Sequence, residues 1–321
     1  MTSKYLVTID LGGTKILSAL INSKNEICAR AKIPTDIDAG VEKLVVSIAD
    51  SVKLLLKENN VAEREVKSVC LGVPGTVNPF TGIINEAPNL GIKNYNIKRA
   101  LSKYFTIPVL IENDVNLAGL GIKKIELKDK VNNMLVVFVG TGIGGALFFD
   151  GKIYRGSSFF AGEIGHMKVD SKGGFSISKK HSTFELNAAR PAMVNAIKKD
   201  LQKGKKSELK EYKSSKKALK SKKLAAAVKA NDPVATKHIA KASASIGTVI
   251  GSVTTLLNLD TIVMGGGVVE AMHGFMMPII KKSFKDAVLN GPGKGVKIFS
   301  TKLGDDAALY GGIALTEEFL G

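Results

Sequence analysis

The chain has 321 residues, of which 45% are hydrophobic, and its 46 lysines and arginines against 29 acidic residues give a net charge of +17. A chain of this length can bury a large core and favours two domains or lobes over one. Glycine is abundant, tryptophan is absent and aromatic residues are few. This composition favours an α/β protein with many tight turns over a nucleic-acid reader built on aromatic stacking.

Much of the positive charge lies in one lysine-rich segment, residues 198–223, where 12 lysines face only Asp200, Glu208 and Glu211. The segment contains no arginine, the residue that contacts phosphates and base edges bidentately. We therefore expect a solvated helix or loop with at most weak attraction to polyanions, and no specific nucleic-acid partner.

The sequence also indicates a compartment. The two cysteines, Cys28 and Cys70, form no disulfide framework. The first apolar run is short and is interrupted by Asp10, so it does not read as a signal peptide. No later run reaches the length of a membrane span without a charge. We expect a soluble, cytoplasmic protein with no membrane partner.

Apolar periodicity predicts alternating strands and helices along the chain. The expected strands are residues 5–10, 14–21, 66–72, 109–113, 133–140, 146–150, 260–266 and 296–300. The expected helices are residues 40–59, 97–105, 116–124, 232–257, a stretch after residue 271, and 305–319. This order is typical of α/β sheets covered by helices.

Two stretches of the chain resemble each other. Residues 5–21 (YLVTIDLGGTKILSALI) and 134–150 (MLVVFVGTGIGGALFFD) both read as strand, glycine turn, strand. The repetition predicts a duplicated domain, with a cleft between the copies.

Three glycine turns stand at predicted strand ends. In the first, Gly12 and Gly13 allow backbone N–H groups to approach an anion, Thr14 adds a hydroxyl, and Asp10 is placed to hold a hydrated Mg²⁺. The second contains Gly140, Thr141, Gly142, Gly144 and Gly145, and the third contains Gly265, Gly266 and Gly267 and opens a helix. Together they predict a phosphate donor held by backbone donors. Neither the dinucleotide fingerprint nor the Walker lysine pattern fits.

Residues 161–186 set Glu163, His166 and Glu185 among glycines and hydroxyl residues. These residues alone leave four roles open for His166: metal ligand, acid–base catalyst, substrate anchor or structural histidine. Glu185 also fits a capping box with Ser182.

Several motifs resemble the ROK family of repressors, open reading frames and kinases, within the actin-like ATPase superfamily. They are DLGGTK, VPGTVNP, NEAPNLG, IENDVN, the run from Val139 to His166 and GDDAALYGG. The resemblance implies a two-lobed actin-like ATPase (ribonuclease H-like) fold, a sugar between the lobes, ATP with Mg²⁺ as phosphoryl donor, and a homodimer. The expected lobes are residues 1–117 with 305–321, and residues 118–304.

The resemblance also implies site roles. Asp114 would be the base that takes the sugar hydroxyl proton, although either Asn113 or Asp114 also fits a simple helix cap. The implied sugar contacts are Gly75, Asn89, Asn113, Asp114, Glu163, His166 and Glu185. The implied ATP contacts are Asp10, Gly12, Gly13, Thr14, Lys15, Gly140, Thr141, Gly142, Gly265, Gly266 and Gly267, with Asp10 reaching Mg²⁺ through water.

One departure from the family concerns zinc. Most members follow the Gly-His pair with a Cys-x-Cys-x4-Cys cluster, and the matching positions here are Ser176, Ser178 and Thr183. Hydroxyl groups are much weaker zinc ligands than thiolates. We expect no zinc site.

The acceptor is less sharply indicated. The motifs are most similar to those of glucokinases, which phosphorylate the 6-hydroxyl of glucose, but kinases of N-acetylmannosamine, N-acetylglucosamine, fructose and allose share them. Polyphosphate is an alternative donor. A sugar-sensing repressor is a third reading, disfavoured because such relatives place a helix-turn-helix ahead of the first glycine-turn strand. A non-catalytic sugar-binding module is a further reading.

Overall fold

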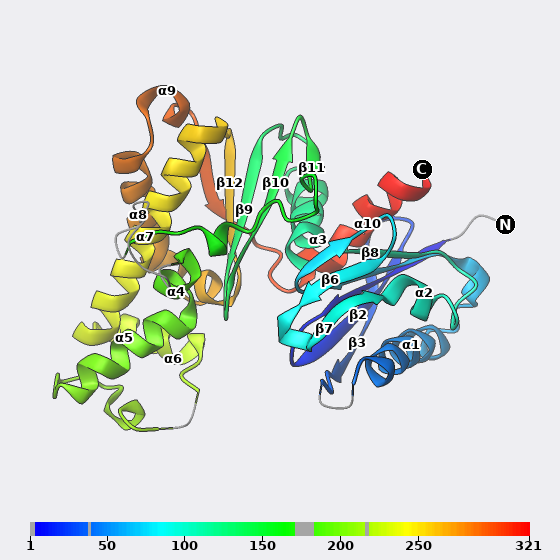
Figure 1. Ribbon diagram of the computed structural model, residues 1–321, viewed down its shortest axis with the longest axis horizontal. Coiled ribbons are helices and arrows are strands. Elements are labelled where there is room, and N and C mark those ends of the chain that lie inside the picture. Colours follow the sequence, from blue (N-terminus) through cyan, green and yellow to red (C-terminus); the bar gives the residue numbers. More distant parts are fainter. Residues whose placement is uncertain (1–3, 38–39, 171–182, 216–217) are drawn as a thin grey trace. The chain divides into compact units, whose positions relative to one another are not determined.

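The computed structural model describes residues 4–37, 40–170, 183–215 and 218–321 (Figure 1). It divides the chain into two compact units. Unit 1 comprises residues 1–130, 153–161 and 305–321, and unit 2 comprises residues 131–152 and 162–304. The expected lobes placed residues 118–130 and 153–161 in the second lobe, whereas both stretches belong to unit 1.

Unit 1 contains a five-stranded sheet in the order β3-β2-β1-β4-β8. Its strands are β1 (Tyr5–Leu11), β2 (Lys15–Asn22), β3 (Ile27–Pro34), β4 (Val66–Val73) and β8 (Val109–Asn113). β1 is antiparallel to β2 and parallel to β4, which is parallel to β8. The register pairs Asp10 with Gly72 and Gly72 with Glu112. The carboxyl ends of three strands therefore meet at one edge, where the first site residues stand.

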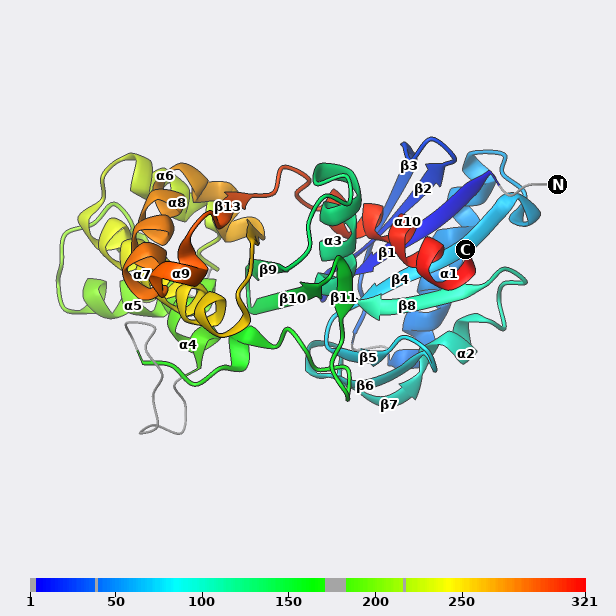
Figure 2. The same cartoon turned by 90° about the horizontal axis from the view of Figure 1, so that it is seen from above.

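Helices cover both faces of this sheet (Figures 1 and 2). They are α1 (Val41–Glu58), α2 (Ile97–Leu101), α3 (Asp114–Gly121) and α10 (Asp306–Leu320), with short turns η1 (Glu63–Glu65), η2 (Pro88–Leu90) and η3 (Ile122–Glu126). α1 packs on β2 and β3, whereas α10 packs on β1, β4 and α3. A Cβ on Gly311 would stand 1.9 Å from the Leu117 carbonyl oxygen. This close approach of α10 to α3 keeps the stretch after residue 117 in unit 1.

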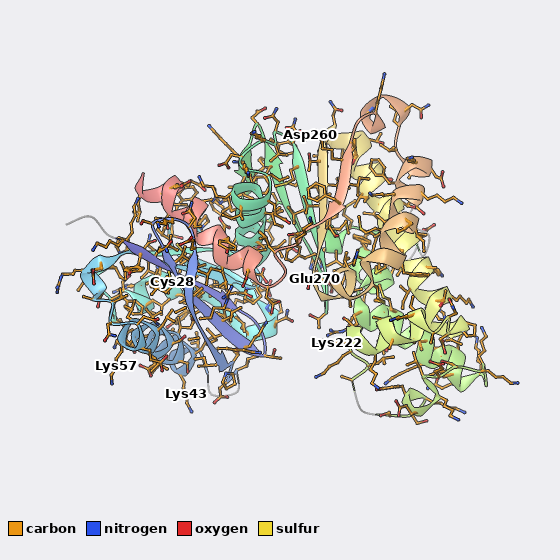
Figure 3. All side chains as sticks on the ribbon, turned by 180° about the vertical axis from the view of Figure 1, so that it is seen from behind. Cys28, Lys43, Lys57, Lys222, Asp260 and Glu270 are labelled. Carbon is orange, nitrogen blue, oxygen red and sulfur yellow. The ribbon has the colours of Figure 1, made fainter. Side chains whose placement is uncertain are left out.

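A small antiparallel sheet, β5-β6-β7, completes unit 1, with strands β5 (Thr76–Asn78), β6 (Ile83–Ala87) and β7 (Ile92–Asn96). The cysteines lie apart within the unit. Cys28 is exposed on edge strand β3 (Figure 3), and Cys70 is buried in β4.

The sheet of unit 2 repeats the order of the first as β11-β10-β9-β12-β13. Its strands are β9 (Met134–Val139), β10 (Ile143–Phe149), β11 (Lys152–Tyr154), β12 (Thr261–Gly265) and β13 (Lys297–Ser300). β9 is antiparallel to β10 and parallel to β12, as β1 is to β2 and β4. The duplication predicted from the two glycine hairpins is therefore present in the strand order as well.

The remaining helices belong to unit 2. They are α4 (Phe184–Ala188), α5 (Arg190–Gln202), α6 (Ser221–Lys229), α7 (Pro233–Leu257), α8 (Gly267–Ala287) and α9 (Asn290–Gly293), with turns η4 (Ile164–His166) and η5 (Lys210–Tyr212). Among the described residues, α7 alone has the length and composition to cross a membrane, yet 61% of the apolar window is buried inside the protein. It is the central helix of this core, packed on α8.

The lysine-rich segment is folded wherever the structure describes it. Leu201, Leu209, Tyr212 and Leu219 anchor it in the core of unit 2. Its lysines lie mostly on the outside, and Lys222 stands at the start of α6 (Figure 3). Part of the charge is neutralised locally, because Asp200 accepts from Lys205 Nζ at 2.8 Å and His238 Nε2 at 2.9 Å.

Candidate active site

The first glycine turn joins β1 to β2 and is closed by its own backbone. The Gly12 N–H donates to the Lys15 carbonyl at 2.9 Å, and Thr35 Oγ1 donates to the Gly12 carbonyl at 2.7 Å. A Cβ on Gly13 would meet nothing within 4 Å, and both Gly13 and Thr14 are exposed. The hydrogen bonds of Gly12 thus fix the base of the turn, and its tip is accessible to a ligand.

Four charged side chains gather at the carboxyl edge of the unit 1 sheet. Lys15 Nζ forms an ion pair with Asp305, the residue before α10. The pKa of Asp10 is raised to about 7, first by burial and then by the negative charges of Asp114 and Asp305, while the positive charge of Lys15 lowers it. A partly buried carboxylate among like charges is a favourable place for a divalent cation. Asp10, Asp114, Asp305 and Lys15 thus form one electrostatic cluster.

The turn into α3 holds Asn113 and Asp114. Asn113 caps the helix, because its Oδ1 accepts from the Asn116 N–H at 2.9 Å. Its Nδ2 donates to the Gly75 carbonyl at 2.9 Å. Asp114 is the first residue of the helix, and its Oδ1 accepts from the Val115 N–H at 2.9 Å. The capping role therefore belongs to Asn113, which leaves the helix's first carboxylate to the charged cluster.

Gly75 connects this turn to the end of β6. It has φ of 107°, and a Cβ there would lie 2.3 Å from the Glu86 carbonyl oxygen. Asn89, three residues further along, lies exposed on η2. Gly75 and Asn113 are thus brought together in unit 1, and Asn89 stands on the adjoining turn.

The glycine turn of unit 2 joins β9 to β10. The Gly140 N–H donates to the Gly142 carbonyl at 2.8 Å, and Thr141 is exposed at the tip. The Ile143 N–H donates to Glu185 Oε2 at 2.8 Å. A Cβ on Gly142 would stand 2.6 Å from that same oxygen. The turn and Glu185 therefore hold each other in place.

Glu163, His166 and Glu185 lie together in unit 2. His166 Nε2 is 3.6 Å from Glu163 Oε2, and the two side chains are 72% and 39% exposed. Burial raises the pKa of Glu163, His166 lowers it and Glu185 raises it. Gly162 and Gly165 bring this turn against β10, since a Cβ on either would lie within 2.3 Å of a backbone oxygen. The arrangement is a polar, half-open cluster of acids and an imidazole, suited to hydroxyl ligands.

The third glycine run leads from β12 into α8. Gly266 precedes the helix with φ of 83°, and a Cβ there would lie 2.6 Å from the Val139 carbonyl oxygen. The run therefore packs directly beside the start of the Gly140–Gly142 turn. Glu270 stands in the first turn of the same helix (Figure 3).

The helix cap near Glu185 differs from the expected capping box. The N-cap of α4 is Thr183, whose Oγ1 accepts from the Leu186 N–H at 3.2 Å. Glu185 is turned to the Ile143 amide instead. The capping-box prediction was wrong because Glu185 is used by a tertiary contact. Ser182, and the zinc-cluster positions Ser176 and Ser178, lie outside the described residues.

Sequence reasoning gave no role to Asp305. It pairs with Lys15 across 290 residues of sequence, and only its place in the GDDAALYGG motif marked it. The described residues contain no group of three or more His, Cys, Asp or Glu side chains arranged to hold a metal ion.

Comparisons with known proteins agree with this architecture. The glucokinase of Halalkalibacterium halodurans is 30% identical over 313 residues, 97% of this chain and 94% of that protein. A xylose repressor of Caldicellulosiruptor bescii is 28% identical over 199 residues, 62% of this chain and 50% of the repressor. A crystal structure of a ROK family glucokinase from Streptomyces griseus with glucose and AMPPNP has a TM-score of 0.80 at 23% identity, covering 98% of this chain and 99% of that one. The model of the ROK family matches residues 6–318. The chain, with its duplicated sheets and actin-like ATPase fold, belongs to the ROK family.

Proposed function

We propose that the protein is an ATP-dependent hexose kinase that converts glucose to glucose 6-phosphate. One observation carries the proposal: Asp114 lies within electrostatic reach of Asp10 at the sheet edge where Lys15 and the first glycine turn also stand. A candidate base therefore adjoins a candidate phosphate-binding turn within one unit. Phosphoryl transfer needs that pair of devices and little covalent chemistry.

Each group in unit 1 has a separate role in this proposal. Asp114 takes the proton from the sugar hydroxyl, and Lys15, paired with Asp305 in the free protein, turns to the phosphates. The amides of Gly12 and Gly13 and the hydroxyl of Thr14 donate to phosphate oxygens. Mg²⁺ supplies neutralising charge on the phosphates, and Asp10 holds it through water.

The sugar is held in the proposal by groups from both units. Gly75, Asn89, Asn113 and Asp114 contribute from unit 1, and Glu163, His166 and Glu185 contribute from unit 2. The turns at Gly140–Gly142 and Gly265–Gly267 bind the rest of ATP. Acids, amides and imidazole at these positions reject ligands that leave them unpaired.

We propose glucose as the acceptor because the relative from H. halodurans, which aligns with 97% of this chain, is named a glucokinase. N-acetylmannosamine, N-acetylglucosamine and fructose are the alternatives. Polyphosphate is the alternative donor, supported by the lysine-rich segment. A regulator is the lesser alternative: the xylose repressor aligns over only half of its own length. We further propose a cytoplasmic location and a homodimer.

A screen over a dozen hexoses and aminohexoses tests the proposal, with ADP release as the readout for ATP and sugar-phosphate formation as the readout for polyphosphate, which releases no ADP. We expect glucose with ATP to give the largest kcat/KM. Activity only with an N-acetylated sugar would refute glucose as the acceptor but would still support a sugar kinase. If none of the sugars is phosphorylated with either donor, a non-catalytic sugar-binding protein would be favoured.

A lysine variant separates the two donors. Neutralising six lysines of residues 198–223 should leave kcat/KM for ATP nearly unchanged at physiological ionic strength, because charges beyond ~8 Å are screened. If the segment guides polyphosphate instead, the same change should reduce polyphosphate-dependent turnover steeply.

A further inference from the structure

A buried carboxylate lies directly behind the Asn113–Asp114 turn. Glu112, in β8, is 1% exposed. Its Oε1 accepts from the Asn113 N–H at 2.9 Å and from Asn116 Nδ2 at 3.1 Å, and its Oε2 accepts from Arg155 Nε at 2.7 Å. One side chain thus ties the last strand residue to the first turn of α3. Its negative charge is balanced by Arg155.

Arg155 uses its remaining donors on a different element. Its two terminal nitrogens donate to Glu318 of α10 at 2.7 and 2.9 Å, a bidentate fork. The guanidinium carbon stands 5.9 Å from the ring centre of Phe319. Burial lowers the pKa of Arg155, but Glu318 and Glu112 raise it above its ordinary value. Arg155, 10% exposed, therefore stays charged and joins β8 to α10.

The segment that carries Arg155 has an unusual place in the chain. Residues 153–161 belong to unit 1, whereas the residues directly before and after them belong to unit 2. The Ala161 N–H donates to the Arg155 carbonyl at 3.2 Å. Phe159 has φ of 65°, and the centre of its ring lies 6.0 Å from the centre of the Phe80 ring. The chain then reaches Glu163, a proposed sugar contact, two residues after the segment ends.

We propose that Arg155 is a positioning residue, which fixes the turn of the base Asp114 through Glu112 and anchors the segment that leads to Glu163. This inference rests on the proposed function. Without Arg155, Glu112 would be a buried carboxylate with no counter-charge, a state that proteins avoid by rearranging. Arg155 therefore affects both turnover and sugar binding while the first glycine turn and Lys15 stay as they are.

Four variants test the inference. In Arg155→Met we expect kcat to fall at least about tenfold and KM for the sugar to rise, with KM for ATP within about twofold, because only the base and the sugar contacts are displaced. Arg155→Lys keeps a charge beside Glu112 but loses the bidentate fork to Glu318, so kcat should recover only in part relative to Arg155→Met. Arg30→Met is the matched control, because Arg30 pairs with Asp306 of the same helix through an exposed contact at 2.7 Å. It should leave the kinetic constants unchanged.

The double variant Glu112→Gln/Arg155→Met guards against simple misfolding, since it leaves no buried charge unpaired. We expect it to melt near the wild-type temperature while kcat stays at least about fivefold low, because residue 112 is no longer clamped. Amide exchange of the peptide spanning residues 112–116 should be faster than wild type in this double variant and in Arg155→Met, and unchanged in Arg30→Met.

Different results would overturn the positioning role of Arg155 and the proposed kinase activity. An active wild type together with a double variant of wild-type kcat and sugar KM would overturn this inference alone, and so would unchanged exchange at residues 112–116. A wild-type protein that phosphorylates no sugar would overturn the proposed function and this inference with it.

Discussion

Asp10 shows how a side chain suited to a bound cation destabilises the free protein. Its pKa in the folded chain, about 7, lies above the ordinary value of 3.8, so the folded state holds the proton more tightly than the unfolded state. The stability of the free protein should therefore fall as pH rises from about 4 to 7 and stay level above that.

Asp10→Asn removes this charge. Without Mg²⁺ or nucleotide, we expect the variant to be more stable than wild type at pH 8 by ~2–4 kcal/mol at most, and the difference to shrink toward pH 4, because each pKa unit corresponds to ~1.4 kcal/mol. Thermal unfolding from pH 4 to pH 8 measures it, and binding of MgATP should be lost in the same variant. A variant less stable than wild type at pH 8 would contradict this assignment of charge.

His166 stands among acids with most of its side chain exposed. We read it as a sugar anchor, so His166→Ala should weaken glucose binding by ~1–3 kcal/mol, the cost of leaving a hydroxyl without its partner. Calorimetric Kd and steady-state kcat separate the two possible roles. A large loss of kcat at unchanged Kd would show that His166 performs acid–base chemistry instead.

At the scale of elements, the start of α4 is ordered by ordinary contacts. Thr183 caps the helix, the Phe184 N–H donates to the Met167 carbonyl at 2.9 Å, and the Phe184 side chain is fully buried. Burial of one such aromatic side chain stabilises by ~1.5–3 kcal/mol and a hydroxyl cap by ~1 kcal/mol. These contacts need only order one helix start on a folded unit, and we expect them to do so without a metal.

We therefore expect the purified protein to contain substoichiometric zinc by elemental analysis. EDTA should leave Tm unchanged in the absence of nucleotide, whereas Thr183→Ala should lower stability by ~1 kcal/mol. One zinc per chain, with a Tm that falls on chelation, would mean that His166 is a metal ligand first.

The same scale shows which elements a sequence reveals. Strands with continuous apolar runs, such as residues 66–72 and 133–140, were predicted because burial on both faces leaves a strong local signal. β3 was missed: its side chains alternate between half-buried and exposed, and Arg30 and Lys32 make the edge strand look like a loop. The short strands β5 to β7 and β11 were missed because polar residues interrupt their apolar pattern, whereas β12, which is also short, is a continuous buried run.

For the whole molecule, the repeated glycine hairpin predicted the repeated sheet. The sheets of unit 1 and unit 2 have the same strand order. The local halves of the candidate site were also within reach, because each glycine turn lies at a strand end. Pairs that only tertiary folding brings together were not, such as Lys15 with Asp305 or Glu112 with Arg155, 43 residues apart. No local pattern requires either pair, so neither could be inferred from spacing.

The central claim is that Asp114 is the base of a sugar kinase. The most direct test is to measure kcat and the glucose Kd of Asp114→Asn and of wild type under the same conditions. We predict that wild type forms glucose 6-phosphate from glucose and ATP. The variant should bind glucose with a Kd within about threefold of wild type and turn over at least ~10²-fold more slowly, because the carboxylate acts only in the transition state. Near wild-type turnover in the variant would contradict the account.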